Sequence, residues 1–159
     1  MEIIVRDARK EDMPDVHSLI YELAVFENEE NAVAITAEDL VRDGFGEKVL
    51  FHCFVAEVNK RVEGIALIYP RYSTWKGPTI HLEDLVVREQ MRGKGLGSML
   101  FTEVIKYGHS LGVKRIEWAV LDWNQPAIDF YEKNGAKVLR DWDTVQMDEQ
   151  AINTYISKH

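Results

Sequence analysis

A glycine-rich turn stands in the middle of the sequence, between a segment with the pattern of a strand and one with the pattern of a helix. Its seven residues are Arg92, Gly93, Lys94, Gly95, Leu96, Gly97 and Ser98. A strand that leads through such glycines into a helix presents unpaired backbone N–H groups to an anion, and glycine lets the ligand approach the backbone closely. Because Arg92 and Lys94 add local positive charge, the turn predicts a binding site for a pyrophosphate group.

The common nucleotide motifs do not explain this turn. A dinucleotide fingerprint that begins at Gly93 needs a glycine at position 98, where the chain has Ser98. The phosphate-binding loop of nucleoside triphosphatases, with its Gly-Lys-Ser/Thr ending, is also absent. The turn instead reads Arg-x-x-Gly-x-Gly, with Arg92, Gly95 and Gly97 at the defined positions.

Hydrophobic periodicity predicts a single α/β domain over residues 1–159, in the order β-α-α-β-β-β-α-β-α-β. The expected strands cover Ile3–Val5, Phe51–Val58, Val62–Tyr69, Thr79–Val87, Ile116–Val120 and approximately Val138–Gln146. The expected helices run from Met13 to Phe26, from a Thr36 N-cap to a stop at Gly44, from Leu96 to a Gly112 cap, and from an Asn124 N-cap to Gly135, with a frayed helical tail at the end. Pro70 is expected to end the central hairpin, and the sheet should be mixed, antiparallel first and parallel across the helical crossover.

Composition and charge limit the class of protein. The chain has 159 residues, a 46% hydrophobic share and a net charge of −8, which favours a globular domain with a cationic partner over a nucleic-acid binder. No segment has the pattern of a signal peptide or a membrane span, so a cytoplasmic protein without membrane contact is expected. Cys53 is the single cysteine, excludes an internal disulfide and is expected to fill the core. The five histidines show no metal-ligand spacing, so no metal is expected.

Two adjacent acidic residues, Glu83 and Asp84, lie in the strand expected before the glycine-rich turn. Neighbouring residues of a strand point to opposite faces, so at least one carboxylate should face the sheet interior or a cleft. Burial of an unpaired charge is costly. The pair is therefore either a strand end that reaches solvent, or a base and cation anchor in a binding site.

Several stretches, taken with the glycine-rich turn, resemble the GNAT superfamily of N-acetyltransferases and, within it, the diamine acetyltransferase branch. They are 43–46 (DGFG), 51–53 (FHC), 72–77 (YSTWKG), 82–84 (LED) and 119–125 (AVLDWNQ). The segments 73–77 and 121–125 most resemble thialysine acetyltransferases, and the resemblance runs from about Ile4 to Ala136. It implies a GNAT fold with a mostly antiparallel central sheet flanked by helices, acetyl-CoA as co-substrate, a small cationic amine as acceptor, and a homodimer with exchanged C-terminal contacts.

The resemblance also implies roles for individual residues. Glu83 would serve the amine as base or through water, with Glu27 and Asp84 beside it and Trp75 in a loop at the substrate cleft. Tyr131 would protonate the departing thiolate, since a phenol with a pKa of ~10 can donate to a thiolate with a pKa near ~8.5. The remaining coenzyme contacts that the resemblance implies are the glycine-rich turn and Leu85, Val86, Val87, Asn124 and Ala127.

Two departures from the polyamine-acetylating members indicate a shorter amine as substrate. Phe26 stands where those members carry an aromatic hydroxyl, and Ser73 stands where they carry a carboxylate. Loss of an acid and a hydroxyl should weaken the selection of a long polycation. Two other functions remain open from the sequence: a non-catalytic acetyl-CoA sensor, and an acetyltransferase acting on protein lysines or N-termini.

Overall fold

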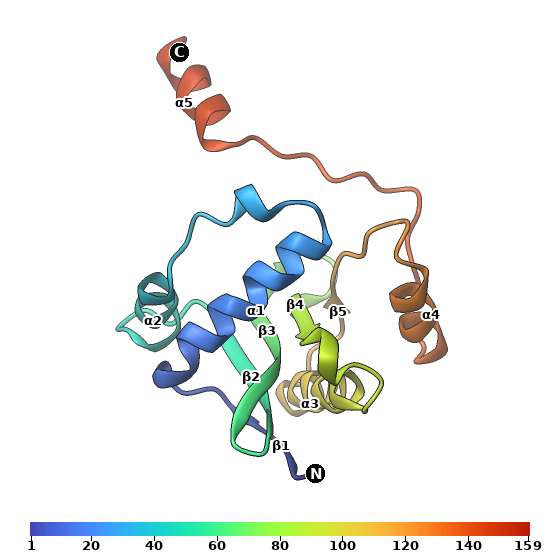
Figure 1. Ribbon diagram of the computed structural model, residues 1–159. Coiled ribbons are helices and arrows are strands. Elements are labelled where there is room, and N and C mark those ends of the chain that lie inside the picture. Colours follow the sequence, from blue (N-terminus) through green and yellow to red (C-terminus); the bar gives the residue numbers. More distant parts are fainter. The chain divides into compact units, whose positions relative to one another are not determined.

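The computed structural model describes residues 1–159, and the chain divides into two compact units, Met1–Ala119 and Val120–His159 (Figure 1). The strands and helices of the first unit are β1 (Ile3–Asp7), α1 (Met13–Phe26), α2 (Ala37–Phe45), β2 (His52–Val58), β3 (Arg61–Ser73), β4 (Gly77–Val87), α3 (Leu96–Leu111) and β5 (Ile116–Glu117). The second unit contains α4 (Gln125–Lys133) and α5 (Glu149–Ser157). None of the helices combines the length and the apolar character that crossing a bilayer requires.

The first unit is built on one sheet with the strand order β1-β2-β3-β4-β5. Strands β1 to β4 pair antiparallel with their neighbours, and β5 pairs parallel with β4. The mixed sheet predicted from the sequence is therefore confirmed. The parallel pairing is short, because only Ile80 and His81 of β4 face Ile116 and Glu117 of β5.

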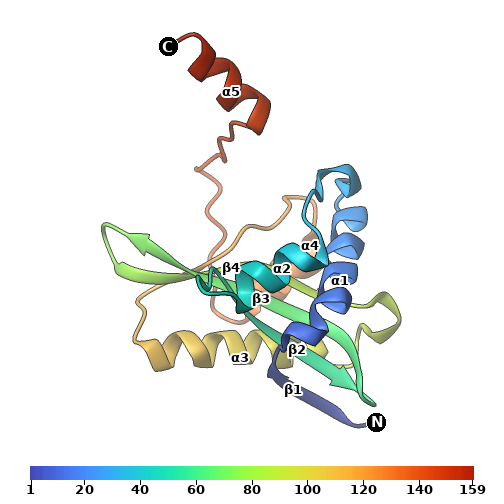
Figure 2. The ribbon, with the colours of Figure 1, turned by 90° about the vertical axis from the view of Figure 1, so that its left-hand side faces the viewer.

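Helices cover both faces of this sheet (Figure 2). On one face α1 and α2 close a core around Met13, Leu19 and Ile65, none of which is exposed to solvent. On the other face α3 packs Leu100 and Val104 against the second core. Strand β2 contributes side chains to both cores, because side chains alternate between the two faces of a strand. Cys53 and Val55 lie in the first core, and Phe54 and Ala56 lie in the second.

The predicted helix boundaries are mostly confirmed. Helix α1 covers the predicted range, and α3 ends on Gly112 with a positive φ of 72°. Thr36 caps α2 in a reciprocal capping box with Asp39. Asn124 caps α4 by accepting a hydrogen bond from the N–H of Ala127 at 3.4 Å.

Two predicted stop signals are wrong. Gly44 lies inside α2, which continues to Phe45 and ends on Gly46. A Cβ on Gly44 would lie 2.5 Å from Cζ of Phe51, so this glycine serves a close approach of the Phe51 ring. Pro70 does not end β3, which runs to Ser73. Pairing with β2 stops at Ile68, and beyond that point β3 has a neighbour on one side only, where a missing N–H is tolerated.

Two predicted strands at the C-terminal end also differ. The strand expected at Ile116–Val120 contains two paired residues, Ile116 and Glu117. The strand expected at Val138–Gln146 does not form, so the predicted order loses its last element. A strand needs a neighbour for its backbone hydrogen bonds, and no strand pairs with this segment. Its apolar side chains are exposed, with Trp142 at 70% and Val145 at 91%.

Candidate active site

The glycine-rich turn connects β4 to α3 and has the backbone shape expected of an anion site. Gly93 and Gly95 have positive φ values of 78° and 89°, and a Cβ on either would meet no atom within 4 Å. A side chain at either position would therefore face open space, and it is the left-handed backbone conformation that favours glycine there. A Cβ on Gly97 would lie 3.8 Å from the Val87 side chain, an ordinary contact, so its backbone is less constrained.

The N-terminus of α3 leaves its first N–H groups available. Its N-cap is Gly95, so no side chain caps it, and the first turn carries no acidic residue. The unpaired N–H groups and the positive end of the helix dipole favour a bound anion. Arg92 and Lys94 lie in the same turn, and the residues present fit a diphosphate group.

A network of charged side chains holds the segment that leads into this turn, Arg88 and Glu89, against α1. The Glu22 carboxylate accepts hydrogen bonds from the N–H of Glu89 at 3.1 Å and from Nη1 of Arg88 at 3.3 Å. Nε of Arg88 also lies 3.3 Å from Oε2 of Glu63, a carboxylate buried on β3. The backbone N–H of Arg88 donates to the Glu63 carbonyl oxygen at 2.9 Å. These contacts hold the residues just before the turn in place against α1 and β3.

A second link joins the turn to the end of α1. The Arg92 guanidinium lies 5.7 Å from the centre of the Phe26 ring, within the range of a cation–π contact. Its Nε donates to the carbonyl oxygen of Val87 at 3.3 Å. Phe26 and Arg92, predicted for substrate and coenzyme respectively, therefore meet in the structure.

A β-bulge in β4 decides where the two adjacent carboxylates point. The register with β3 shifts so that Leu82 faces Ile68 and Asp84 faces Leu67, leaving Glu83 as the extra residue. Before the bulge Leu82 packs on the α3 side, and after it Val86 packs on the α1 side. The expectation of opposite faces is therefore wrong. Because the bulge interrupts the alternation, Glu83 continues the face of His81, and Asp84 that of Val86.

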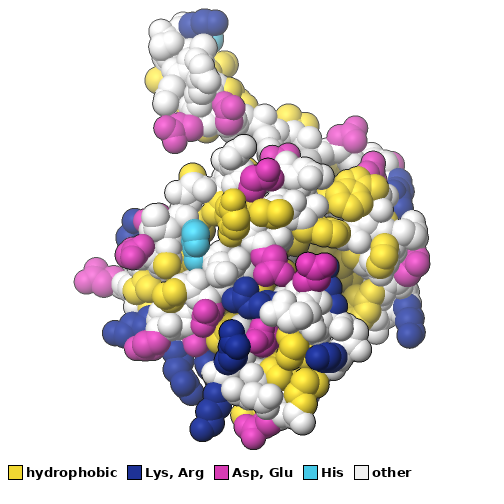
Figure 3. Space-filling model, viewed as in Figure 1, with side chains coloured by type: hydrophobic (Ala, Val, Ile, Leu, Met, Phe, Trp, Pro, Cys, Tyr) yellow, Lys and Arg dark blue, Asp and Glu magenta, His cyan; other side chains and the backbone are white.

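The acids predicted for the amine, Glu27, Glu83 and Asp84, form one negative cluster. Burial, as the largest cause, and the negative charges of Glu83 and Glu27 together raise the pKa of Asp84 to about 7. Burial also raises the pKa of Glu27, at the C-terminal end of α1, with a smaller effect from Glu29. No cation or hydrogen-bond donor contributes to the shift of Asp84. Acidic side chains also gather near the middle of the face of the larger unit in Figure 3. Such a cluster suits a cationic ligand.

The sequence analysis missed two neighbours of Glu83, His81 and Tyr69, and also Arg71, which contacts His81. Nε2 of His81 lies 3.4 Å from Oε2 of Glu83, and Nδ1 of the same ring lies 3.4 Å from Nη1 of Arg71. Burial raises the pKa of the Tyr69 hydroxyl, and the negative charge of Glu83 raises it further. The signal available was the spacing of His81 and Glu83, two residues apart on a strand, which places both on one face.

The edge of β4 beyond His81 is open on the side away from β3. Pairing with β5 involves only Ile80 and His81, whereas pairing with β3 continues to Val87. Alternate backbone groups of the segment Leu85–Val87 therefore have no strand partner on the open side. This open edge of β4 leads directly into the glycine-rich turn. One elongated ligand can therefore contact both the edge and the turn.

The other predicted residues lie elsewhere in the two units. Trp75 is 79% exposed at the tip of the β3–β4 hairpin, where Ser73 Oγ accepts from its N–H at 3.1 Å. Cys53 is buried in the first core, as expected, and burial raises the pKa of its thiol to about 12. Asn124, Ala127 and Tyr131 belong to the second unit. Burial raises the pKa of the Tyr131 phenol, and the roles of these three toward the coenzyme stay predictions.

Comparison with known families decides the class of the protein. The family model described as "Acetyltransferase (GNAT) family" matches residues 9–136. The chain belongs to the GNAT acetyltransferases. The turn that begins at Arg92 lies within the matched residues.

Curated relatives indicate which branch of the family the chain resembles. Thialysine N-epsilon-acetyltransferase of Bos taurus is 36% identical over 167 residues, covering 98% of both chains. The enzyme of the same name from Caenorhabditis elegans is 40% identical over 141 residues, covering 87% of both. A spermidine/spermine N(1)-acetyltransferase-like protein of Homo sapiens is 36% identical, with 83% of this chain matched. The resemblance to the diamine branch and its thialysine members is thus confirmed.

Solved structures confirm the fold. An integron cassette protein of V. cholerae has a TM-score of 0.79 at 21% identity and covers 98% of both chains. An aminoglycoside acetyltransferase from a soil metagenomic sample has a TM-score of 0.71 at 19% identity, with 91% of this chain and 97% of the other covered. The predicted GNAT fold, with a mostly antiparallel sheet flanked by helices, is therefore correct.

Proposed function

We propose that this GNAT enzyme transfers an acetyl group from acetyl-CoA to the primary amine of a small cationic molecule, by direct attack in a ternary complex. The observation that carries the proposal is the cluster of Glu27, Glu83 and Asp84 beside the open edge of β4. Burial and like charge make the ionised form of Asp84 unfavourable, and a bound ammonium group offsets both effects. The names of the curated relatives, all acetyltransferases of small amines among those described above, support the same reaction.

The reaction needs few catalytic groups from the protein, because a thioester is already activated toward attack by an amine. The amine nitrogen attacks the acetyl carbon, the N–C bond forms, the C–S bond breaks, and the leaving thiolate needs a proton. In this proposal Glu83 accepts the proton of the amine, and Asp84 and Glu27 hold its positive charge. Backbone N–H groups of Leu85–Val87 polarise the carbonyl, and Tyr131 donates the proton to the thiolate.

The diphosphate of the coenzyme is held by the turn from Arg92 to Ser98 in this proposal. The positive φ of Gly93 and Gly95 and the uncapped N-terminus of α3 support this role. Asn124 and Ala127 are proposed to contribute from the start of α4. No cluster of three or more His, Cys, Asp or Glu that could hold a metal occurs in the structure, and the mechanism uses no metal.

The acceptor is proposed to be thialysine or another short amine. Phe26, which carries no hydroxyl, stands at the end of α1 against Arg92, and Ser73 uses its Oγ to hold the β3–β4 turn. Neither residue adds a negative charge for the far end of a polyamine. A panel of thialysine, lysine, putrescine, spermine and a lysine peptide, each with acetyl-CoA, tests this by thiol release. We expect kcat/KM for thialysine to exceed that for spermine, and equal values would overturn the choice of substrate.

The same panel separates the alternatives. An acetyl-CoA sensor would bind the coenzyme and release no thiol with any amine. A protein acetyltransferase would turn over the peptide and leave the small amines untouched. Glu83→Gln should lose turnover while it still binds acetyl-CoA, and Glu38→Gln, an acid in the first turn of α2, serves as the matched control.

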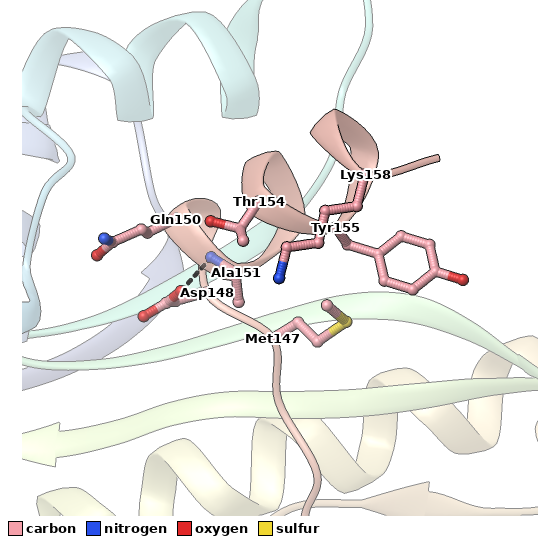
Figure 4. A pocket seen from close by; sticks show the side chains of 7 residues that line it. All are labelled: Met147, Asp148, Gln150, Ala151, Thr154, Tyr155 and Lys158. Carbon is pink, nitrogen blue, oxygen red and sulfur yellow. Dashed lines mark hydrogen bonds between the residues drawn. The ribbon is translucent and has the colours of Figure 1, made fainter.

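We further propose a cytoplasmic homodimer in which the C-terminal tail contacts the partner subunit. The tail exposes apolar side chains, among them Trp142 and Val145. A groove of ≈ 470 Å³ runs along α5, with Met147 and Tyr155 among its lining residues (Figure 4). Sedimentation of the full chain and of a chain ending at residue 146 tests the assembly. A monomer in both cases overturns it.

A further inference from the structure

A histidine beside the proposed base links three strands of the sheet. Nε2 of His81 faces Oε2 of Glu83 at 3.4 Å, and its Nδ1 faces Nη1 of Arg71 at 3.4 Å. Arg71 is in turn bound to Oε1 of Glu117 at 2.7 Å. The order Glu117, Arg71, His81, Glu83 therefore runs from β5 through β3 to the bulge of β4.

The chemistry of arginine fixes the tautomer of the imidazole. A guanidinium group donates hydrogen bonds and accepts none, so Nδ1 of His81 must be the acceptor of this contact. The ring proton of the neutral imidazole then lies on Nε2. Since a carboxylate only accepts, Nε2–H is the donor that faces Oε2 of Glu83 at 3.4 Å, and the Tyr69 hydroxyl is hydrogen-bonded to the same carboxylate.

The surroundings hold the ring in this orientation. The side chain of His81 is 15% exposed, against 51% for Glu83. Its ring lies 5.1 Å from that of Tyr69, which is paired with it across β3 and β4. Glu117, whose Oε2 lies 4.0 Å from Nη1 of Arg115, keeps Arg71 in place from the β5 side.

We propose that His81 is a positioning residue for amine acetylation, which holds the Glu83 carboxylate in the orientation in which it faces the amine. The inference rests on the proposed function of Glu83. In the supported step the proton of the ammonium group passes to Glu83, and its electron pair stays on nitrogen for the attack. His81 donates one hydrogen bond throughout and exchanges no proton. A base oriented by a second hydrogen bond is the arrangement that efficient proton transfer requires.

The test removes the donor and keeps the ring. His81→Phe retains an aromatic ring against Tyr69 but cannot donate to Glu83. We expect kcat with thialysine to fall about tenfold, as for loss of an orienting hydrogen bond, while KM for acetyl-CoA stays within about twofold because the glycine-rich turn is untouched. His52→Phe is the matched control, since His52 pairs with Asp7 at 3.0 Å and should leave both constants unchanged.

Two further comparisons distinguish positioning from a general structural effect. In a Glu83→Gln background His81→Phe should cause no additional loss, because residues that act through one another are not additive. His81→Gln, whose amide nitrogen reaches the place of Nε2, should keep most of the turnover. His81→Asn, whose amide nitrogen lies near Nδ1, should lose it. The Gln and Asn pair also decides the question if the Phe variant does not fold.

Three results would overturn the proposal: full turnover in His81→Phe, an undiminished tenfold loss in the Glu83→Gln background, or equal turnover in the Gln and Asn variants. Failure of the proposed function has a different signature. In that case the wild-type protein releases no thiol from acetyl-CoA with any amine of the panel.

Discussion

Replacing Asp84 with asparagine should make the free enzyme more stable while it weakens amine binding. The pKa of this carboxyl rises from 3.8 to about 7 on folding, chiefly through burial. At ~1.4 kcal/mol per pKa unit this corresponds to about 4 kcal/mol of unfavourable free energy for the ionised form at high pH. Water penetration and relaxation reduce such figures, and we expect a measured gain of roughly 1–3 kcal/mol in Asp84→Asn.

The sign of the pH dependence follows from the direction of this shift. The folded state keeps the Asp84 proton while the unfolded chain has lost it, so stability falls as pH rises from near 4 to about 7. Asparagine carries no charge and escapes this loss. The two proteins should therefore be nearly equal in stability near pH 4, diverge up to pH 7, and stay apart by a constant amount above it.

Urea denaturation at pH 4.5, 6 and 8 measures this difference. Asp143→Asn, a change at an exposed position of the tail, serves as a control and should shift stability by less than about 0.5 kcal/mol at every pH. Saturating amine should stabilise the wild-type protein and have little effect on Asp84→Asn. A variant no more stable than wild type at pH 8 would refute the claim that Asp84 is a partly buried acid without a compensating partner.

Three other variants test the remaining parts of the site. Tyr131→Phe should reduce kcat about 10- to 100-fold, since it removes a general acid, and unchanged thiol release would exclude that role. Gly95→Ala, at a φ of 89°, should cost ~1–2 kcal/mol of stability and weaken coenzyme binding measured by calorimetry, whereas Gly97→Ala should be tolerated. Glu22→Gln, which weakens the attachment of the turn to α1, should raise KM for acetyl-CoA several-fold without a comparable change in KM for the amine. An equal change in both Michaelis constants would contradict this assignment.

The parts of the fold that the sequence predicted well are those determined by local chemistry. The capping box at Thr36, the left-handed residue at Gly112 and the glycine-rich turn each carry their own signal. The wrong predictions are those in which residues distant in the sequence determine the local structure. Gly44 is a glycine because of the Phe51 ring, and Pro70 is tolerated in β3 because β2 stops short of it.

The candidate site shows the same division. The acids were found from their position in a strand before the turn, but the faces they occupy were mispredicted, because a bulge at Glu83 cannot be read from alternation alone. His81 was set aside with the other histidines, since its partners Glu83, Arg71 and Tyr69 meet only in the folded sheet. The long segment after α4 was assigned to a strand from its β-forming residues, and no neighbouring strand is there to pair with it.

Titration calorimetry of the protein with coenzyme A and with pantetheine, which lacks the diphosphate, tests the role of the glycine-rich turn most directly. If the N–H groups at the start of α3 bind the diphosphate, coenzyme A should bind about 100-fold more tightly than pantetheine, and added salt should reduce the difference. Equal affinity for the two ligands, or no binding of coenzyme A by the folded protein, would contradict the assignment.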